Sequence, residues 1–182
     1  MKTKTKKKRA TRKTAPQPPG VKVSKPHMPA DYLGLHKGDF LPWSHAEQRL
    51  EKSRGYWVCT TRPDGRPHSM PVWGFWLDGA LYFSTGTSTR KAKNIAHQPE
   101  VSIHLESTED MVVLEGRAVE VDPQKFAPAF RKRADAVSRK KYKMGFTIMP
   151  GSVFYRVRPR VALAWLEKKF PYHSTRWEFP AS

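Results

Sequence analysis

The chain has 182 residues, and its 34 lysines and arginines against 16 aspartates and glutamates give a formal net charge of +18. This length suits one domain with a tail, and an aromatic content of 12% is enough to build a core. The single cysteine, Cys59, excludes an internal disulfide framework, and the cysteine and histidine positions do not have zinc-site spacing, so we expect no metal.

Residues 1–30 form a basic tail that the sequence predicts to be disordered. The tail is rich in lysine, threonine and proline, and ten basic residues precede the first acid, Asp31. No apolar run suited to a signal peptide or a membrane span follows, so we expect a cytoplasmic protein without a membrane partner. Residues 2–25 could bind nucleic acid or another polyanion weakly. A merely solubilising extension is an equally good interpretation. Residues 31–182 would form the folded domain.

The first half of the domain shows one helix and three strands. The Ser-x-x-Glu pattern at residues 44–47 predicts a capping box that starts a helix ending near residue 53. A Pro/Gly turn at residues 62–65 and the hairpin signal Asp78-Gly79 separate runs of β-forming residues. The predicted antiparallel strands are residues 56–61, 67–77 and 80–83.

A turn rich in hydroxyl groups follows at residues 84–89 and leads Arg90 and Lys91 into the first turn of a helix that ends near His97. Free backbone N–H groups, hydroxyl donors and two cations at one helix start favour an anion site, most simply for a phosphate. The alternative is that Ser88 or Thr89 caps an ordinary surface helix whose cations are solvated.

The second half of the domain adds four strands and a third helix. Alternating apolar residues at 101–106 direct His104 outward, which makes it a poor candidate for chemistry. A helix is predicted to start at Asp122-Pro123, with Phe126 and Phe130 on one face. Further strands are predicted at residues 111–121, 153–158 and 161–167. The pattern favours a mainly β (α+β) fold, a six-stranded antiparallel barrel with peripheral helices.

The strand at residues 68–77 is apolar on both faces. Met70, Val72 and Trp76 share one face, and the other carries Pro71, Trp73, Phe75 and Leu77. A barrel needs only one apolar face per strand, so a helix, a second subunit or a flat apolar ligand must cover the other. Residues 161–166 show the same excess. A homodimer with a ligand site at its interface is the simplest arrangement.

The motifs of residues 61–68, 71–74, 79–85, 89–102 and 115–118 resemble those of the pyridoxamine 5′-phosphate oxidase-like split β-barrels, which bind flavin or deazaflavin at a dimer interface. The resemblance covers residues 44–122 well and residues 165–179 more loosely. It implies that Arg90 and Lys91 hold a cofactor phosphate, with Ser84, Thr85 and Thr89 beside it.

The resemblance also implies that the backbone of residues 69–73 lines the cofactor ring. The residues of this segment are Ser69, Met70, Pro71, Val72 and Trp73. The looser C-terminal match adds Trp165 and Arg176 to the implied cofactor-binding set.

Four positions depart from the true oxidase. Ser69 and Gly74 stand where the oxidase has an arginine and a lysine, Met111 stands where it has a glutamine, and residues 176–178 lack the Arg-x-His of its C-terminus. These departures argue against pyridoxal phosphate synthesis. The closer resemblance is to the branch that includes F420-dependent reductases.

The sequence therefore predicts an oxidoreductase that transfers a hydride between FMN or F420 and an unknown small organic substrate. The catalytic residue is unknown, and His68 is the best candidate for an acid or base. Basic residues at positions 131–133, 139 and 140 slightly favour F420, which is the more highly charged cofactor. The alternatives are a non-catalytic flavin- or haem-binding module and a nucleic-acid-associated protein.

Overall fold

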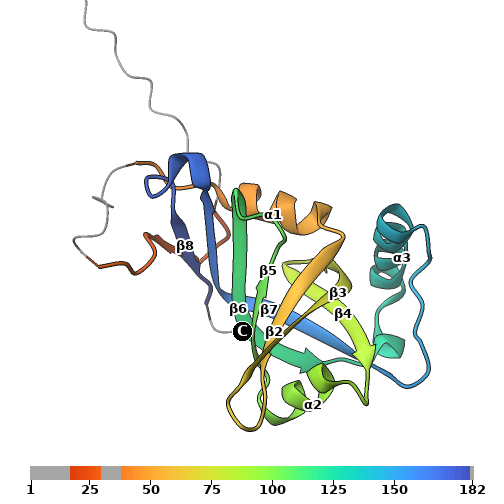
Figure 1. Cartoon of the computed structure of the whole chain (residues 1–182). Helices are drawn as coiled ribbons and strands as arrows, with labels where there is room; N and C mark the ends of the chain where they lie inside the picture. The colour runs from red at the N-terminus through yellow and green to blue at the C-terminus, as the bar shows by residue number, and fades with distance from the viewer. Residues whose placement is uncertain (1–16, 30–37, 181–182) are drawn as a thin grey trace, which may run out of the picture.

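The computed structural model describes residues 17–29 and 38–180 (Figure 1). Its helices are α1 (Trp43–Lys52), α2 (Arg90–His97) and α3 (Pro128–Tyr142), with short 3₁₀ turns at Pro123–Lys125 and Glu167–Lys169. Its strands are β1 (Lys22–Ser24), β2 (Gly55–Thr61), β3 (Pro67–Leu77), β4 (Ala80–Gly86), β5 (Glu100–His104), β6 (Asp110–Glu120), β7 (Ser152–Leu166) and β8 (Thr175–Glu178).

Strands β2 to β7 form a closed antiparallel barrel, which confirms the predicted fold. The strand order is β7-β4-β3-β2-β5-β6, and β6 pairs again with β7 to complete the circle. The two strands predicted at residues 153–158 and 161–167 are one continuous strand, β7. Along one edge, β7 pairs first with β4 and then with β8, so β8 and β1 extend the sheet beyond the barrel.

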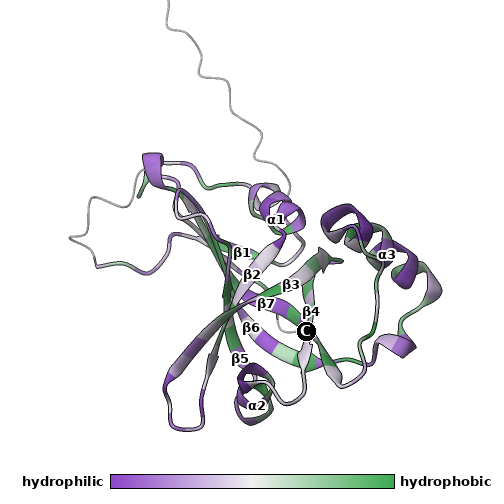
Figure 2. Ribbon diagram, turned by 45° about the vertical axis from the view of Figure 1, so that its right-hand side comes forward, coloured by the Kyte–Doolittle hydropathy of each residue, from purple (hydrophilic) through white to green (hydrophobic). Residues whose placement is uncertain are grey.

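Two clusters of apolar side chains hold the barrel and its covering helix together. Alternating residues of every barrel strand fill the interior, where Tyr56 and Phe83 are almost completely buried, and buried Trp177 of β8 belongs to the same cluster. A second cluster lies between the outer face of β3, β4 and β7 and helix α3. It includes Phe75 and Tyr82, so α3 covers part of the second apolar face of β3 that the sequence identified. The hydropathy colouring shows strands in which apolar and polar residues alternate, and a largely polar helix α3 (Figure 2).

The predicted start of the third helix, α3, is wrong by several residues. The segment after Asp122-Pro123 forms only a 3₁₀ turn, and α3 begins at Pro128. Phe126 therefore lies before the helix, although it still packs against Phe130 with ring centroids 4.7 Å apart. Two proline-led starts in six residues explain the break, because proline is favoured in the first turn of a helix and its ring obstructs a helix interior.

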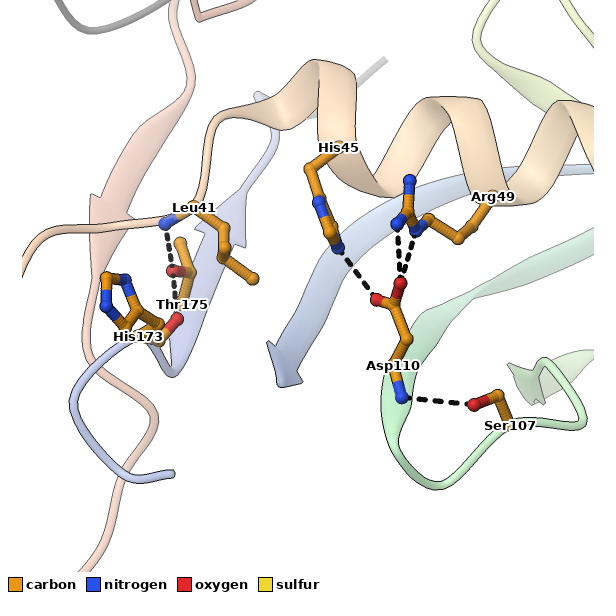
Figure 3. A network of polar contacts seen from close by, with 7 residues as sticks. All are labelled: Leu41, His45, Arg49, Ser107, Asp110, His173 and Thr175. Atoms are coloured by element: carbon orange, nitrogen blue, oxygen red, sulfur yellow. Dashed lines mark hydrogen bonds and ion pairs between the residues drawn. The ribbon is translucent and has the colours of Figure 1, made fainter. Parts of the chain in front are cut away.

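Helix α1 does not start with the predicted capping box. Its N-cap is Pro42, and no side chain caps it. The helix is held by buried Trp43 and by Asp110 at the start of β6, which accepts hydrogen bonds from His45 Nε2 at 2.7 Å and Arg49 Nε at 2.6 Å (Figure 3). Tertiary contacts thus fix this helix start.

Part of the predicted disordered tail is ordered. Residues 1–16 lie outside the described residues, but Lys22–Ser24 pairs with β8, and Trp177 Nε1 donates to Gln17 Oε1 at 3.0 Å. Val21 and Val23 pack against the barrel core. Within the described part of the chain, no helix is long and apolar enough to cross a membrane.

Candidate functional site

The start of α2 lies beside the end of β4, at one end of the barrel (Figure 1). Thr89 caps this helix, because its Oγ1 accepts from Ala92 N at 3.3 Å and donates to Gly86 O at 2.8 Å. Thr85 Oγ1 lies 3.1 Å from Thr89 Oγ1. Thr89, and not Ser88, is therefore the cap, and two threonine hydroxyls are placed together where the helix begins.

Lys91 is a buried cation in this corner. Only 8% of it is exposed, and its Nζ lies 3.5 Å from Thr85 Oγ1. Across the described residues, no carboxylate forms an ion pair with it, and burial lowers the pKa of its ammonium group. Arg90, the neighbouring residue, is exposed. A buried ammonium with one long hydrogen bond to a neutral group is poorly compensated.

The hairpin between β2 and β3 adds the cationic side chain of Arg62 and the imidazole of His68. Burial lowers the pKa of His68, and the positive charges of Arg62, Lys91 and Arg90 lower it further, so these groups lie near one another. Arg62 Nε is buried and has no hydrogen-bond partner among the described residues. Arg62 is absent from the set predicted from the sequence. Strand order could have revealed Arg62. Because β2, β3 and β4 are antiparallel neighbours, the end of β2, the start of β3 and the end of β4 lie at the same end of the barrel.

Asn94 ties α2 to this hairpin. Its side chain is fully buried, and its Nδ2 donates to Thr60 Oγ1 at 2.9 Å, which in turn donates to His68 O at 3.2 Å. The Oδ1 atom of Asn94 has no partner in the described part of the chain. This network holds β3 and α2 at a fixed distance, with His68 and Lys91 between them.

The predicted cofactor strand splits into different environments. Val72 is buried in the barrel interior, so only its backbone is available to a ligand, whereas Met70 and Trp73 are 49% and 66% exposed. Ser69 and Pro71 are exposed as well. Trp57, opposite Pro71 on β2, lies on the same outer face and stacks on His104 with centroids 6.1 Å apart. The open part of this face therefore carries the exposed apolar residues Trp57, Pro71 and Trp73.

Ser84 lies on the opposite side of β4 from Thr85, on the outer face that α3 partly covers. There it lines a cavity of about 320 Å³ together with Trp73 and Tyr142. Tyr142, at the end of α3, stacks on Trp73 with ring centroids 5.0 Å apart. The cavity therefore opens next to the predicted cofactor strand.

Trp165 and Arg176 are not brought to the cationic corner. Thr85 pairs with Val153 near the start of β7, and Trp165 lies twelve residues further along, roughly 40 Å of strand at about 3.3 Å per residue. Arg176 on β8 pairs with Leu163 and forms an ion pair with Glu178. β8 and α2 lie at opposite ends of the barrel (Figure 1). Within one chain these two residues belong to a different region.

The corner suits a phosphate group. A phosphate would supply acceptors for Lys91 Nζ, for the unpaired Arg62 Nε and for free N–H groups at the start of α2. Neutralising the buried charge of Lys91 would also remove its desolvation cost. The described residues contain no group of three or more potential metal ligands.

Comparisons with known proteins agree with this geometry. Residues 43–166 match the family model described as pyridoxamine 5′-phosphate oxidase. A pyridoxine/pyridoxamine 5′-phosphate oxidase of Bacteroides thetaiotaomicron is 29% identical over 155 residues, covering 82% of this chain and 66%, slightly under two thirds, of that protein.

Two solved structures share the fold. An F420 reductase matches with a TM-score of 0.50 and 23% identity over 64% of this chain and 94% of its own. An FAD-binding protein from Mesorhizobium loti matches with a TM-score of 0.54 and 18% identity over 88% of this chain and 100% of its own. At these identities the likeness concerns the fold.

Proposed function

The chain belongs to the pyridoxamine 5′-phosphate oxidase family, because the family model covers well over half of it, and from this we propose that it is an oxidoreductase that binds a phosphate-bearing flavin or deazaflavin. The cofactor, F420 or FMN, would exchange a hydride with a small organic substrate, and this chemistry resides in the cofactor ring. The protein would bind and orient both partners and exclude water.

The cationic corner carries this proposal. Lys91 is buried without a carboxylate, and Arg62 Nε is buried without a hydrogen-bond partner among the described residues. In this proposal one phosphate group would compensate both side chains. The Thr85 and Thr89 hydroxyls would contact the same group or the adjoining polyol chain, and Arg90 would contribute from the surface.

The proposed ring site is the open segment of β3, Ser69 to Trp73. Its outer face is apolar and exposed, and in an isolated chain it would leave Trp57 and Trp73 in contact with water. We include in the proposal a homodimer in which a second copy covers this face and brings its own Trp165 and Arg176 toward the cofactor. Sedimentation analysis tests this point, because a protein that remains monomeric at micromolar concentration would contradict it.

Synthesis of pyridoxal phosphate is not the favoured reaction. A Cβ atom added at Gly74 would lie 2.6 Å from Tyr82 O, so β3 and β4 approach too closely there for the lysine that the oxidase resemblance implies. Ser69 likewise offers no charge. The arginine and the lysine that bracket this strand in the oxidase are therefore both absent.

The choice between F420 and FMN rests on charge, and we favour F420. Arg131, Lys132 and Lys140 on α3 and Lys93 on α2 form no ion pair within the described residues, so they could attract the anionic tail of F420. Arg133 and Arg139 cannot contribute fully, because Asp78 and Asp135 already bind them. Titration with both cofactors at two salt concentrations decides the matter. Tighter binding of FMN under both conditions would exclude F420.

The central test is cofactor titration of Arg90→Ala and Lys91→Ala. Losing a charged hydrogen bond costs about 1.5–3 kcal/mol, so Lys91→Ala should weaken binding of the preferred cofactor roughly 10- to 100-fold. Arg90→Ala should weaken it less, because this side chain is exposed. Lys52→Ala, which removes an exposed charge at the end of α1, is the control. Unchanged binding in both variants would place the anion site elsewhere.

A non-catalytic flavin- or haem-binding module is the second candidate. It is favoured by the absence, within the described residues near the corner, of any acid or base other than His68. Turnover with an electron donor and an artificial acceptor separates the two candidates, because a storage or sensor module would bind its ligand without steady-state turnover.

A further inference from the structure

The cavity of about 320 Å³ lies between helix α3, the segment 143–151 that follows it, and the outer face of β3 and β4. Its size is at the lower end of the range for small-molecule sites, and its walls are mostly apolar. They include the rings of Trp73, Phe75, Tyr82 and Phe146 and the thioethers of Met144 and Met149. The shape and lining suit a flat apolar molecule.

No charged side chain lines this cavity, although α3 is strongly basic. The cations of the helix are directed elsewhere. Arg133 binds Asp78 at 2.6 Å and Arg139 binds Asp135 at 2.7 Å. Lys141 turns to the barrel, where its Nζ donates to Tyr56 Oη at 2.9 Å. A carboxylate or phosphate in the cavity would therefore lose its hydration without gaining a counter-charge, and this is costly.

The polar groups in the wall are few and neutral. The Tyr142 hydroxyl is already engaged, because it accepts from Gly74 N at 2.9 Å and lies within donating distance of Gly74 O and Arg54 O, at 2.6 and 2.7 Å. The hydroxyls of Ser84 and Ser138 have no hydrogen-bond partner among the described residues, and Ser138 is only 7% exposed. They can offer one or two neutral hydrogen bonds to a ligand.

We propose that this cavity is the substrate site and that it selects a neutral, flat aromatic molecule with at most one or two hydroxyl or carbonyl groups, and rejects phosphorylated or carboxylated ones. The assignment as a substrate site rests on the proposed function, because Trp73 and Gly74 join the cavity to the strand proposed to carry the cofactor ring. The polarity of the walls is independent of the cofactor. Met144 and Met149, 55% and 61% exposed, form a deformable mouth through which the molecule enters.

Calorimetric titration of the full chain with 2-naphthol and with 2-naphthoate, both without cofactor, tests the selectivity. Phosphate buffer keeps the cationic corner filled in both titrations. We expect 2-naphthol to bind at least 10-fold more tightly than 2-naphthoate. Equal binding, tighter binding of the carboxylate, or no binding of 2-naphthol would overturn the proposal.

Two lysine substitutions locate the bound molecule. Met149→Lys adds a charge in the cavity wall, so it should weaken 2-naphthol binding at least 5-fold and strengthen 2-naphthoate binding. Ile148→Lys adds the same charge to the neighbouring residue, which does not line the cavity, and should change neither affinity. Equal effects of the two substitutions would overturn the proposal. Cofactor binding is measured separately on the same proteins, so a failure here is distinguishable from a failure of the proposed function.

Discussion

The buried charge of Lys91 lowers the stability of the free protein, whereas the same charge would strengthen the binding of a phosphate group. Its ammonium group is buried beside Thr85 without a carboxylate among the described residues, and burial lowers its pKa. Uncompensated buried charges destabilise a fold, and binding sites commonly accept this cost. The effect of this lysine on the stability of the free protein can therefore be measured before its ligand is identified.

We predict that Lys91→Met raises or maintains the melting temperature of the cofactor-free protein while it weakens cofactor binding by about 1.5–3 kcal/mol. Methionine keeps the apolar stem and removes the buried charge. Thermal melts with and without cofactor measure both effects. Lys52→Met, at an exposed position of α1, should change neither. A large loss of stability in Lys91→Met would show that the charge is compensated in the free protein.

Asp110 makes the free energy of unfolding depend on pH. Burial alone would raise the pKa of this carboxyl, but hydrogen bonds from Arg49 and His45 lower it (Figure 3). A lowered pKa means that the folded state favours the carboxylate. Its contribution is thus complete above the ordinary aspartate pKa of about 4 and is lost as the pH falls through the lower folded value.

We predict that Asp110→Asn destabilises the protein at neutral pH by about 1–3 kcal/mol and flattens the decline in stability below pH 4. Urea denaturation across the acid range measures both effects. Asp39→Asn is the control, because Asp39 is exposed and forms no ion pair within the described residues. An unchanged acid slope in Asp110→Asn would assign this pH dependence to other carboxylates.

The residues of the cationic corner differ in how far sequence could reveal them. Thr89, Arg90 and Lys91 lie within one helix turn, and local spacing was sufficient to predict an anion site there. Arg62 comes from a hairpin about thirty residues earlier, and only strand pairing brings it close. The assignment of Trp165 and Arg176 to the same site is untested, since a single chain keeps them at the other end of the barrel.

At the scale of elements, α3 is held to the barrel by polar contacts of its last turn as well as by the apolar cluster beneath it. The Tyr142 hydroxyl bridges Gly74 and Arg54, its ring stacks on Trp73, and Lys141 reaches Tyr56. Near its middle, Arg133 joins Asp78 on the β3–β4 turn. Contacts at the end of the helix therefore set the width of the cavity beneath it.

We predict that Tyr142→Phe lowers the free energy of unfolding by about 1–3 kcal/mol, because Gly74 loses a partner for its N–H group. The ring stack on Trp73 should persist. Urea denaturation gives the magnitude, and faster tryptic cleavage after Lys143 would locate the change at the end of α3. Tyr172→Phe, at a position 47% exposed, is the matched control. Equal behaviour of the two variants would mean that the bridge contributes little.

The elements themselves were predictable where local rules decide them. Asp78-Gly79 marks a true hairpin, and both residues adopt positive φ, 52° and 70°. Local rules failed where packing decides, as at α1, which starts at buried Trp43 and not at a capping serine. Local rules also failed at residues 158–160, where they predict a break between two strands. Strand β7 instead continues through Pro159, which pairs with Gly116 of β6 at a register shift between Glu115 and Gly116.

At the scale of the whole molecule, the N-terminal segment is part of the fold from Gln17 onward. The strand pairing of Lys22–Ser24 with β8 and the packing of Val21 and Val23 distinguish it from a free tail. Eight of the ten basic residues before Asp31 nevertheless lie within residues 1–16, outside the described part. Truncation at two positions can therefore separate the effect of the basic residues 1–16 from the contribution of the β1 segment to stability.

We predict that deletion of residues 1–16 removes most salt-sensitive retention on nucleic acid and leaves the melting temperature nearly unchanged. Deletion of residues 1–25 should in addition destabilise the domain by roughly 2–4 kcal/mol, because two valines and the Gln17 hydrogen bond are lost. Thermal melts and a salt gradient on immobilised DNA measure the two effects. Identical melting of both truncated proteins would mean that β1 contributes little, and persistent retention would move the polyanion site to α3.

The pairing of strand β7 along both edges determines when its amide protons can exchange with solvent. It is hydrogen bonded to β6 along one edge, and to β4 and then β8 along the other. Its partners are distant in sequence, as with Leu81 and Val157, so these pairings form slowly and together. Fraying of a single neighbour frees only one edge of β7. Amide protons in its centre should therefore exchange with deuterium only when the whole barrel opens. Their exchange rate would then report global unfolding.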